Sequence, residues 1–543
     1  MKKAIALSLA LLMAGCSTTS SVSNVSNVSS TPVSSVSSVD SVVEPDKDVV
    51  TRTVQEKMRT VITTDGEVDD MNSVLRALLY ANDMDIAGIV ITSSMYHYAG
   101  DPEENIEPMR WTGTQWIYDF LDDYEAVYDN LKAHDPDYPT ADALRDITKI
   151  GNITNVGEME KITEGSEFLK ELFLDDDERT LYVQTWGGTN TTARALKSIE
   201  EEYKDTDQWK DIQQKIYDKL VVYIILDQDD SYSDYIAVNW PKLQIINDRS
   251  NFWRFAYLWT FNDDVVNETL HADWEYENLI KDKGVYMENY ALMGDGKIIE
   301  GEDYAELRGT EDYLAANPQY EKYDFISEGD SPSFLYLIDT GLRSLEDPSY
   351  GGWGSRFAKV SDTLYKNDAV DYNPATNQFE ATYTLTRWFT DIQNDFAERV
   401  NWTLTDDDKA VNHAPVVSVA QGIDITASAG SQVTLTAVGE DPDGDTLSYR
   451  WWRYFEADTY DPNESVPETQ LSELSGFQID VIRPVGEDEI LDNIEIDDPN
   501  NAEISFTVPE DAKSGDTIHM IVEVQDNGSH NLKHYQRVII TVE

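Results

Sequence analysis

From about residue 52 to about residue 408, short apolar runs alternate with segments whose apolar residues recur at helical spacing. Such alternation predicts an α/β fold with a mostly parallel sheet flanked by helices. The apolar runs place the expected strands at residues 60–64, 86–92, 180–185, 220–226 and 243–246. The helical spacing places the expected helices at residues 69–81, 165–174, 190–199 and 333–342.

The pattern changes near Asn412. Beyond this residue, short segments alternate apolar and polar positions and are separated by turn residues, which is typical of an immunoglobulin-like β-sandwich. The expected strands are residues 415–419, 432–438, 447–452, 502–508, 517–524 and 537–542. Leu447, Tyr449 and Trp451 alternate onto one face, which we expect to form the core.

Two features of this C-terminal region each have two interpretations. Residues 441–445 (DPDGD) favour a turn, because Pro-Asp-Gly is a strong turn signal, and their carboxylates are also suited to Ca²⁺. Trp452 and Tyr454 fall on the face opposite Trp451. They either pack against the preceding domain or stack on sugar rings.

The N-terminus has the features of an export signal. Lys2 and Lys3 precede an apolar stretch, residues 4–12, that is too short to span a bilayer. Two small residues then precede Cys16, the only cysteine of the chain, so a disulfide framework is excluded. This arrangement resembles the lipobox of bacterial lipoproteins. The resemblance implies lipidation of Cys16 and anchoring at the outer membrane or cell surface, with an ordinary secretory signal as the alternative.

These patterns divide the chain into four segments. Residues 1–16 are the expected lipoprotein signal, and residues 17–52 form a tether rich in Ser and Val. The tether has too little apolar surface to offset its ordering entropy. Residues 53–410 form the α/β domain, and residues 411–543 form the β-sandwich.

The charge of the chain limits the kinds of partner that it can bind. Lys and Arg total 41 against 103 Asp and Glu, which gives a formal net charge of -62. Because binding to phosphate backbones needs basic surface, the charge argues against a nucleic-acid partner. Acidic residues are spread along the whole chain, so we interpret them as a strongly hydrated surface rather than a binding tail.

Candidate chemistry begins where the first expected strand ends. The segment VITTDGEVDD stops its apolar run at Asp65, turns at Gly66, and places Asp69 and Asp70 at the start of a helix. Carboxylates gathered at the C-terminal edge of a parallel sheet suit Ca²⁺ or Mg²⁺, and ligands of open α/β sheets bind at that edge. The spacing alone arises by chance in a chain this acidic, so its strand–turn–helix setting makes it informative.

Other polar clusters follow other expected strands. They are residues 93–94, 186–190, 227–230 and 328–331, and we expect them at the same edge as Asp65.

Two of these segments carry a resemblance to a known family. TTDGEVDDMNSVLRALLYANDMDIAGIVITSS is similar to the opening of nucleoside hydrolases, and TWGGTNTTARAL resembles a Gly-x-x-Thr-Asn-x-Ala segment of that superfamily. With YHYAGD, TEGS, DQDD and EGDSPSF, the chain most resembles a divergent branch of secreted or surface proteins. That branch joins a nucleoside-hydrolase-like domain to a C-terminal β-domain and is described as cellulose-binding. The resemblance covers roughly residues 55–543.

The resemblance implies roles for particular residues. Asp65, Asp70, Asp330 and a backbone carbonyl near Gly188 would bind Ca²⁺ as the cofactor. Asp65 would also orient or deprotonate the attacking water, and Asp69 would accept a hydrogen bond from a ribose-like hydroxyl. For other substrate contacts we name Asn190, Asp229 and Asp230. A helix-capping role is nearly as well supported for these three residues.

The chain also departs from the family. Many nucleoside hydrolases have a histidine before the last aspartate, where this chain has Gly329. His97 and His134 are the only histidines expected in loops near the site, and an isolated loop histidine is more often a surface or packing residue. The leaving-group acid therefore stays unassigned. The leading hypothesis is a surface-anchored, Ca²⁺-dependent hydrolase of N-glycosyl bonds in a small glycoside, and the alternative is a non-catalytic, polysaccharide-binding lipoprotein.

Overall fold

The computed structural model describes residues 57–299, 301–302, 307–474 and 476–543. The predicted signal, the tether and Cys16 lie outside the described residues. Within the described part of the chain, no helix has both the length and the apolar character needed to cross a membrane.

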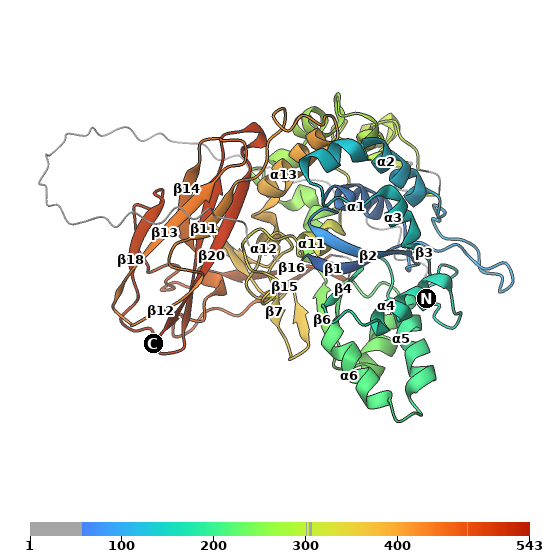
Figure 1. Ribbon diagram of the computed structural model, residues 1–543, viewed down its shortest axis with the longest axis horizontal. Coiled ribbons are helices and arrows are strands. Elements are labelled where there is room, and N and C mark those ends of the chain that lie inside the picture. The colour runs from blue at the N-terminus through green and yellow to red at the C-terminus, as the bar shows by residue number, and fades with distance from the viewer. Residues whose placement is uncertain (1–56, 300, 303–306, 475) are drawn as a thin grey trace, which may run out of the picture.

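An eight-stranded sheet forms the centre of the α/β region (Figure 1). Its order is β3-β2-β1-β4-β5-β6-β8-β7, and its neighbouring strands are parallel except for β7 and β8. The strands are β1 (Met58–Thr64), β2 (Met84–Ile91), β3 (Thr148–Ile150), β4 (Leu181–Thr185), β5 (Leu220–Ile225), β6 (Gln244–Asp248), β7 (Ala358–Lys359) and β8 (Leu364–Lys366). The predicted α/β fold and its five strands are confirmed, whereas β3, β7 and β8 are too short to produce an apolar pattern.

Helices cover both faces of this sheet (Figure 1). One face carries α1 (Val68–Leu79), α2 (Trp116–His134), α3 (Ala141–Asp146) and α13 (Phe389–Trp402), and the other carries α4 (Glu164–Leu174), α5 (Asn190–Tyr203) and α6 (Trp209–Lys219). Shorter helices are α7 (Ala237–Asn239), α8 (Ala272–Glu275), α10 (Glu311–Ala316), α11 (Ser331–Leu335) and α12 (Tyr383–Thr386). Val61 and Ile62 belong to different cores, because neighbouring residues of a strand point to opposite faces.

The helix expected at residues 333–342 is shorter than predicted. It ends at Leu335, so the prediction was wrong beyond that residue. The backbone carbonyls of Thr340 and Gly341 instead accept hydrogen bonds from Tyr535 and Arg537 in the C-terminal region. Tertiary pairing with a distant strand therefore overrides the local apolar pattern.

The C-terminal region is a β-sandwich of two four-stranded sheets. One sheet contains β11 (Val416–Val419), β13 (Gln432–Glu440), β18 (Glu503–Thr507) and β17 (Ile496–Asp497). The other contains β12 (Asp424–Ala427), β20 (Lys533–Val542), β19 (Thr517–Gln525) and β14 (Ser448–Arg453). The pairs are antiparallel except β12 with β20. Trp451 lies in the core between them, with Leu447 and Tyr449 packed against it, as predicted.

A third sheet joins the two regions, and the sandwich stands beside the α/β region across it (Figure 1). It pairs β9 (Asp371–Asn373) and β10 (Gln378–Glu380) with β15 (Gln470–Leu474) and β16 (Phe477–Pro484), in the order β15-β16-β10-β9. Tyr454 is fully buried at this junction and donates a hydrogen bond to Asp371, while Trp452 lies 6.3 Å from Trp388 between ring centres. Of the two interpretations of Trp452 and Tyr454, the structure supports packing.

Candidate metal centre

The end of β1 and the start of α1 bring three aspartates together. Asp65 follows β1, and Asp69 and Asp70 lie in the first turn of α1. Gly66 turns the chain between them with a φ of +81°, and a Cβ there would lie 2.7 Å from a threonine hydroxyl oxygen. The turn therefore requires glycine for both backbone and steric reasons. The Thr64 hydroxyl and the Asp65 N–H both donate to Oδ1 of Asp70, at 2.5 and 3.1 Å, which fixes that carboxylate.

Asp330 joins this group from a distant part of the chain. It is the residue immediately before α11, and carboxylate oxygens of Asp69, Asp70 and Asp330 all lie within 4.8 Å of one another. All four side chains are buried, with Asp65 only 1% and Asp330 only 2% exposed. Oδ2 of Asp330 is buried and has no hydrogen-bond partner among the described residues. A buried carboxylate oxygen without a partner is unfavourable unless a cation compensates it.

The electrostatics of the aspartate cluster, defined as Asp65, Asp69, Asp70 and Asp330, point the same way. Burial is the largest cause that raises the pKa of each carboxyl, and neighbouring carboxylates add to the rise for Asp69, Asp70 and Asp330. A divalent cation would relieve this repulsion. Because the donors are all carboxylate oxygens, they fit Ca²⁺ or Mg²⁺ better than a softer metal.

Tyr257 covers one side of the cluster. Its hydroxyl donates to Oε1 of Glu67 at 2.8 Å and to Oδ1 of Asp69 at 3.2 Å. Burial, followed by the charges of Asp69 and Glu67, raises the pKa of Tyr257 well above its usual value, so the phenol keeps its proton.

A buried ion-pair network lies behind Glu67. His97 is fully buried, with Nε2 at 2.8 Å from Oε2 of Glu302 and Nδ1 at 3.5 Å from Oε2 of Glu67. Arg110 pairs with the same two glutamates. Burial opposes protonation of His97, but the charge of Glu67 and the hydrogen bond to Glu302 outweigh it and raise the His97 pKa. His97 is therefore close to the cluster, as expected, but is held by two carboxylates.

Sequence patterns did not identify most of these covering residues. Glu67 belongs to the first motif, whereas Arg110, Tyr257 and Glu302 come from loops far along the chain. Single charged or aromatic residues in such loops have no periodicity or spacing that distinguishes them from surface residues.

Gly188 and its neighbour lie close to the cluster. A Cβ on Gly187 would lie 2.9 Å from Cβ of Asp65, and one on Gly188 would lie 2.3 Å from Oδ2 of Asp229. The N–H of Gly188 donates to the carbonyl of Ser93. Gly187 therefore packs directly against Asp65, while ligation by the Gly188 carbonyl stays a prediction.

Asn190 and Asp229 make structural hydrogen bonds. The fully buried Asn190 side chain donates to the Ser93 hydroxyl and the Asn152 carbonyl, linking the loops after β2 and β3 to α5. Oδ2 of Asp229 accepts from the N–H of Asn190 at 2.9 Å, and burial raises the pKa of Asp229 to about 6. Asp230 is exposed. Substrate contacts by Asn190, Asp229 and Asp230 stay predictions.

A cavity of about 340 Å³ opens at the same edge of the sheet. Its lining comes from the ends of β5, β6 and β8, from the loop after β2, and from β16 of the C-terminal region. Both aromatic and polar side chains line the cavity. The aromatic residues are Tyr96, Tyr232 and Phe477, and the polar residues are Asp227, Gln228, Asn247, Arg249 and Lys366. The aspartate cluster does not line this cavity.

Two family models match the chain. Residues 59–357 match the model described as "Cellulose-binding Sde182, nucleoside hydrolase-like domain", and residues 432–542 match "Cellulose-binding protein Sde0182, C-terminal domain". No curated protein matches the chain.

Among solved structures, a nucleoside hydrolase-related hypothetical protein from Saccharophagus degradans, described as associated with carbohydrate metabolism, is 25% identical. The match covers 90% of this chain and 100% of that chain with a TM-score of 0.63. An effector protein and a plant nucleoside hydrolase each match 57% of this chain at 10% identity, covering 88% and 87% of their own chains with TM-scores of 0.30 and 0.27.

Proposed function

Because the chain belongs to the cellulose-binding Sde182 family with its nucleoside-hydrolase-like domain, we propose that its aspartate cluster binds Ca²⁺ and hydrolyses N-glycosyl bonds of the nucleoside or ribosyl type. The observation that carries this proposal is the convergence of the buried carboxylates of Asp69, Asp70 and Asp330, with one Asp330 oxygen that has no hydrogen-bond partner among the described residues. A purely structural role leaves this arrangement unexplained, because buried like charges destabilise a fold.

The residues divide the work between binding and proton transfer. Asp69, Asp70 and Asp330 would surround the cation. Asp69 would also accept a hydrogen bond from a sugar hydroxyl, and Asp65 would take the proton of the attacking water. When bound, Ca²⁺ supplies positive charge that keeps the carboxylates ionised and makes a nearby water more acidic. The remaining carboxylate charge stabilises an oxocarbenium-like transition state as the C–N bond breaks, and the departing base takes up a proton from solvent water.

Calorimetric titration with Ca²⁺ tests the metal site. Wild type is expected to bind one equivalent, and Asp70→Asn and Asp330→Asn to bind at least about tenfold more weakly, because each removes a ligand charge. Asp207→Asn, which changes an exposed aspartate elsewhere on the surface, should leave the affinity unchanged. Absence of Ca²⁺ binding by the wild type would contradict the proposal.

Release of reducing sugar from a nucleoside panel then tests the reaction. Asp65→Asn should abolish turnover while the protein remains folded, and added Ca²⁺ should restore the activity of chelator-treated wild type. If wild type binds Ca²⁺ but cleaves no member of the panel, the hydrolase proposal fails and binding without catalysis takes its place.

Polysaccharide binding is the second candidate function, and the 340 Å³ cavity favours it. Aromatic faces pack on the apolar faces of pyranose rings, and the neighbouring amide and charged groups suit sugar hydroxyls. Phe477 of β16 also lines the cavity, so both regions would contribute to one binding surface.

Binding to insoluble cellulose tests this candidate. Phe477→Ala should reduce the bound fraction, whereas Phe261→Ala, an exposed phenylalanine outside the cavity lining, should not. Equal binding of both variants to cellulose would show that the cavity is not the binding site.

We also propose that Cys16 is lipidated and holds the exported protein at the outer membrane or cell surface. Cys16→Ser should move the protein from the membrane fraction to the soluble fraction. An unchanged distribution would favour an ordinary secretory signal.

A further inference from the structure

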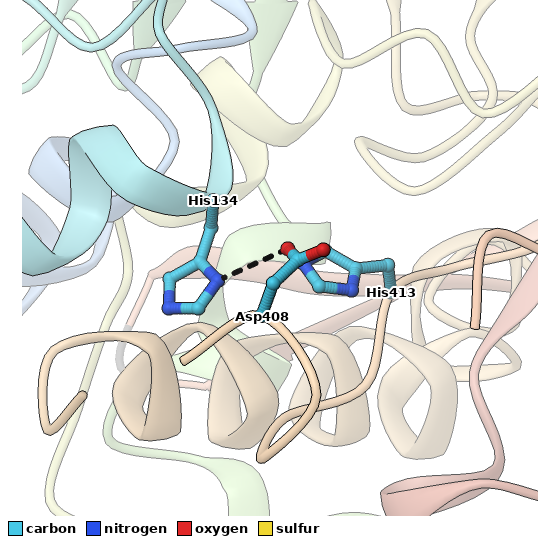
Figure 2. Close-up of side chains that lie close together, drawn as sticks. All are labelled: His134, Asp408 and His413. Atoms are coloured by element: carbon cyan, nitrogen blue, oxygen red, sulfur yellow. Dashed lines mark ion pairs between the residues drawn. The ribbon is translucent and has the colours of Figure 1, made fainter. Parts of the chain in front are cut away.

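Two histidines and an aspartate meet between the α/β region and the sandwich (Figure 2). His134 is the last residue of α2, Asp408 lies in the segment between α13 and β11, and His413 precedes β11. One potential ligand atom from each residue lies within 4.8 Å of the other two. This group is separate from the aspartate cluster and has a different donor chemistry.

Hydrogen bonds around the two imidazoles fix which nitrogen of each ring carries the proton. Nε2 of His134 lies 2.7 Å from the carbonyl oxygen of Thr405, which can only accept, so Nε2 is protonated. Nδ1 of His413 lies 3.1 Å from a carboxylate oxygen of Asp443 and donates to it. Asp443, in the DPDGD loop, also accepts the backbone N–H of His413 at 2.7 Å.

The remaining nitrogens therefore present lone pairs toward Asp408. Nδ1 of His134 and Nε2 of His413 are both buried and have no hydrogen-bond partner within the described residues. The His134 side chain is 0% exposed. A histidine that donates one N–H to a carbonyl or carboxylate and leaves the other nitrogen free has the arrangement found in metal-binding histidines.

The distances within the triad fit a metal better than a direct ion pair. Oδ1 of Asp408 lies 3.6 Å from Nδ1 of His134 and 3.4 Å from Nε2 of His413. Charge-assisted hydrogen bonds are shorter, at about 2.7–2.9 Å. Ligands about 2.0–2.1 Å from a tetrahedral zinc ion are separated by about 3.3 Å.

The surroundings favour a bound cation. His134 is the last residue of a 19-residue helix, and the C-terminal end of a helix carries a partial negative charge. Asp443 adds a carboxylate next to His413. Trp402 lies 5.5 Å from the His134 ring and 5.1 Å from the His413 ring, so both imidazoles are held in place. The Asp408 side chain is 70% exposed, which leaves a fourth coordination position open to water.

We propose that His134, Asp408 and His413 form a zinc site that links α2 of the α/β region to the start of the β-sandwich. Two imidazole nitrogens and one carboxylate are a ligand set typical of Zn²⁺, and a water completes the tetrahedron. A bound ion would tie together two segments that are almost 280 residues apart in the chain, counted from His134 to His413.

The test is calorimetric titration of the chelator-treated full chain with Zn²⁺, in an excess of Ca²⁺ that occupies oxygen-only sites. We expect one equivalent of Zn²⁺ and a higher melting temperature with zinc than without it. Asp408→Ala should weaken zinc binding at least about tenfold, because it removes a ligand from an exposed loop. Asp406→Ala, which removes an exposed aspartate from the same loop, is the matched control and should bind as wild type.

Two further measurements keep the outcome decisive. Co²⁺ in place of Zn²⁺ should give the visible absorption of a tetrahedral site in wild type and lose it in His413→Ala. Asp70→Asn should weaken Ca²⁺ binding and leave zinc binding intact, so failure of one site is distinguishable from failure of the other. Equal zinc affinity in wild type and Asp408→Ala, or absence of zinc binding by the wild type, would overturn the proposal.

Discussion

Position 329 shows how a single small residue shapes the aspartate cluster. A Cβ on Gly329 would lie 2.8 Å from Oδ2 of Asp69 and 3.1 Å from Cβ of Ala256. These contacts are tighter than packed side chains allow, so a larger residue would displace Asp69. A histidine at this position, which the resemblance to nucleoside hydrolases led us to expect, would therefore have to displace Asp69 or Ala256.

Gly329→Ala is therefore expected to lower Ca²⁺ affinity at least about tenfold and to destabilise the fold by about 1–3 kcal/mol. Titration calorimetry and urea denaturation measure the two effects. Gly486→Ala is the control, because its added Cβ would come no closer than 3.3 Å to another atom, Cβ of Glu489, and has no aspartate of the cluster among its nearest atoms. Wild-type affinity in Gly329→Ala would show that Asp69 does not position the cation.

Because Asp69, Asp70 and Asp330 follow expected strands, the sequence predicted that they lie close together, and the structure confirms this proximity. Their ligand roles stay predictions. Tyr257 and Arg110 were beyond sequence reasoning, because they reach the site through loops whose paths depend on the complete fold. The zinc triad was also missed, since each histidine alone fits a packing role.

At the scale of elements, α11 ends earlier than its sequence predicts because backbone hydrogen bonds to a distant strand replace the local helix. The predicted helix extends to Leu342, but Gly341 adopts a φ of +80° and its carbonyl accepts a hydrogen bond from β20. A Cβ at this position would lie 1.8 Å from the carbonyl oxygen of Tyr535. Helix periodicity contains no information about a partner strand almost two hundred residues away.

Gly341→Ala should consequently destabilise the protein by more than about 3 kcal/mol, because backbone strain and a backbone clash add together. Gly422→Ala isolates the strain, since Gly422 also has a positive φ of +88° but no atom within 4 Å of its added Cβ. Its expected cost is about 1–2 kcal/mol. Chemical denaturation of both variants checks the difference, and equal losses would show that no clash occurs.

His519 in β19 makes the junction sensitive to acid. It is buried, and its Nδ1 accepts a hydrogen bond from Arg537 at 2.9 Å. Burial, and then the positive charge of Arg537, lowers the pKa of His519 to about 2. In the unfolded chain the pKa is about 6.5, so below that pH the unfolded state binds a proton that the folded state does not. The stability contributed by neutral His519 is therefore complete above pH 6.5 and is lost as the pH falls toward 2.

His519→Gln removes this titration and should flatten the acid side of the stability curve. Between pH 6 and pH 4, wild type should lose about 1.4 kcal/mol more per pH unit than the variant. Urea denaturation at several pH values measures the slopes. His271→Gln, at a largely exposed histidine, should keep the wild-type slope. Parallel curves for wild type and His519→Gln would contradict the assigned cause.

At the scale of the whole molecule, the net charge of -62 opposes the compact state. Salt screens this repulsion, with a Debye length that falls from about 30 Å at 0.01 M to about 3 Å at 1 M. The melting temperature should therefore rise as NaCl increases over that range. KCl at the same ionic strength should give the same rise, because screening depends on ionic strength and not on which salt supplies it. A melting temperature independent of salt would show that surface repulsion is already compensated.

The division into two regions was predictable because their hydrophobic patterns differ. In the first region, short apolar runs alternate with segments of helical spacing, whereas in the second, apolar and polar residues alternate along short strands. The sheet that joins them was not. β9 and β10 contain three residues each, and only β10 pairs with β16, about a hundred residues further along the chain. Strands this short produce no pattern, so the sequence predicted two domains and a packing contact through Trp452 and Tyr454, but not the sheet that joins them.

This junction predicts that the two regions unfold together. Calorimetry of the full chain should show one cooperative transition, because separating the regions removes β16 from β10 and exposes Tyr454, Trp452 and Trp388. A fragment of residues 57–410 should melt well below the full chain, since it also leaves Asp371 without the hydroxyl of Tyr454. Asp371 retains Arg356 and Arg387 in the fragment, so the loss comes from the new apolar surface more than from the carboxylate. Two resolved transitions, or a fragment as stable as the full chain, would show instead that the regions are independent domains that merely touch.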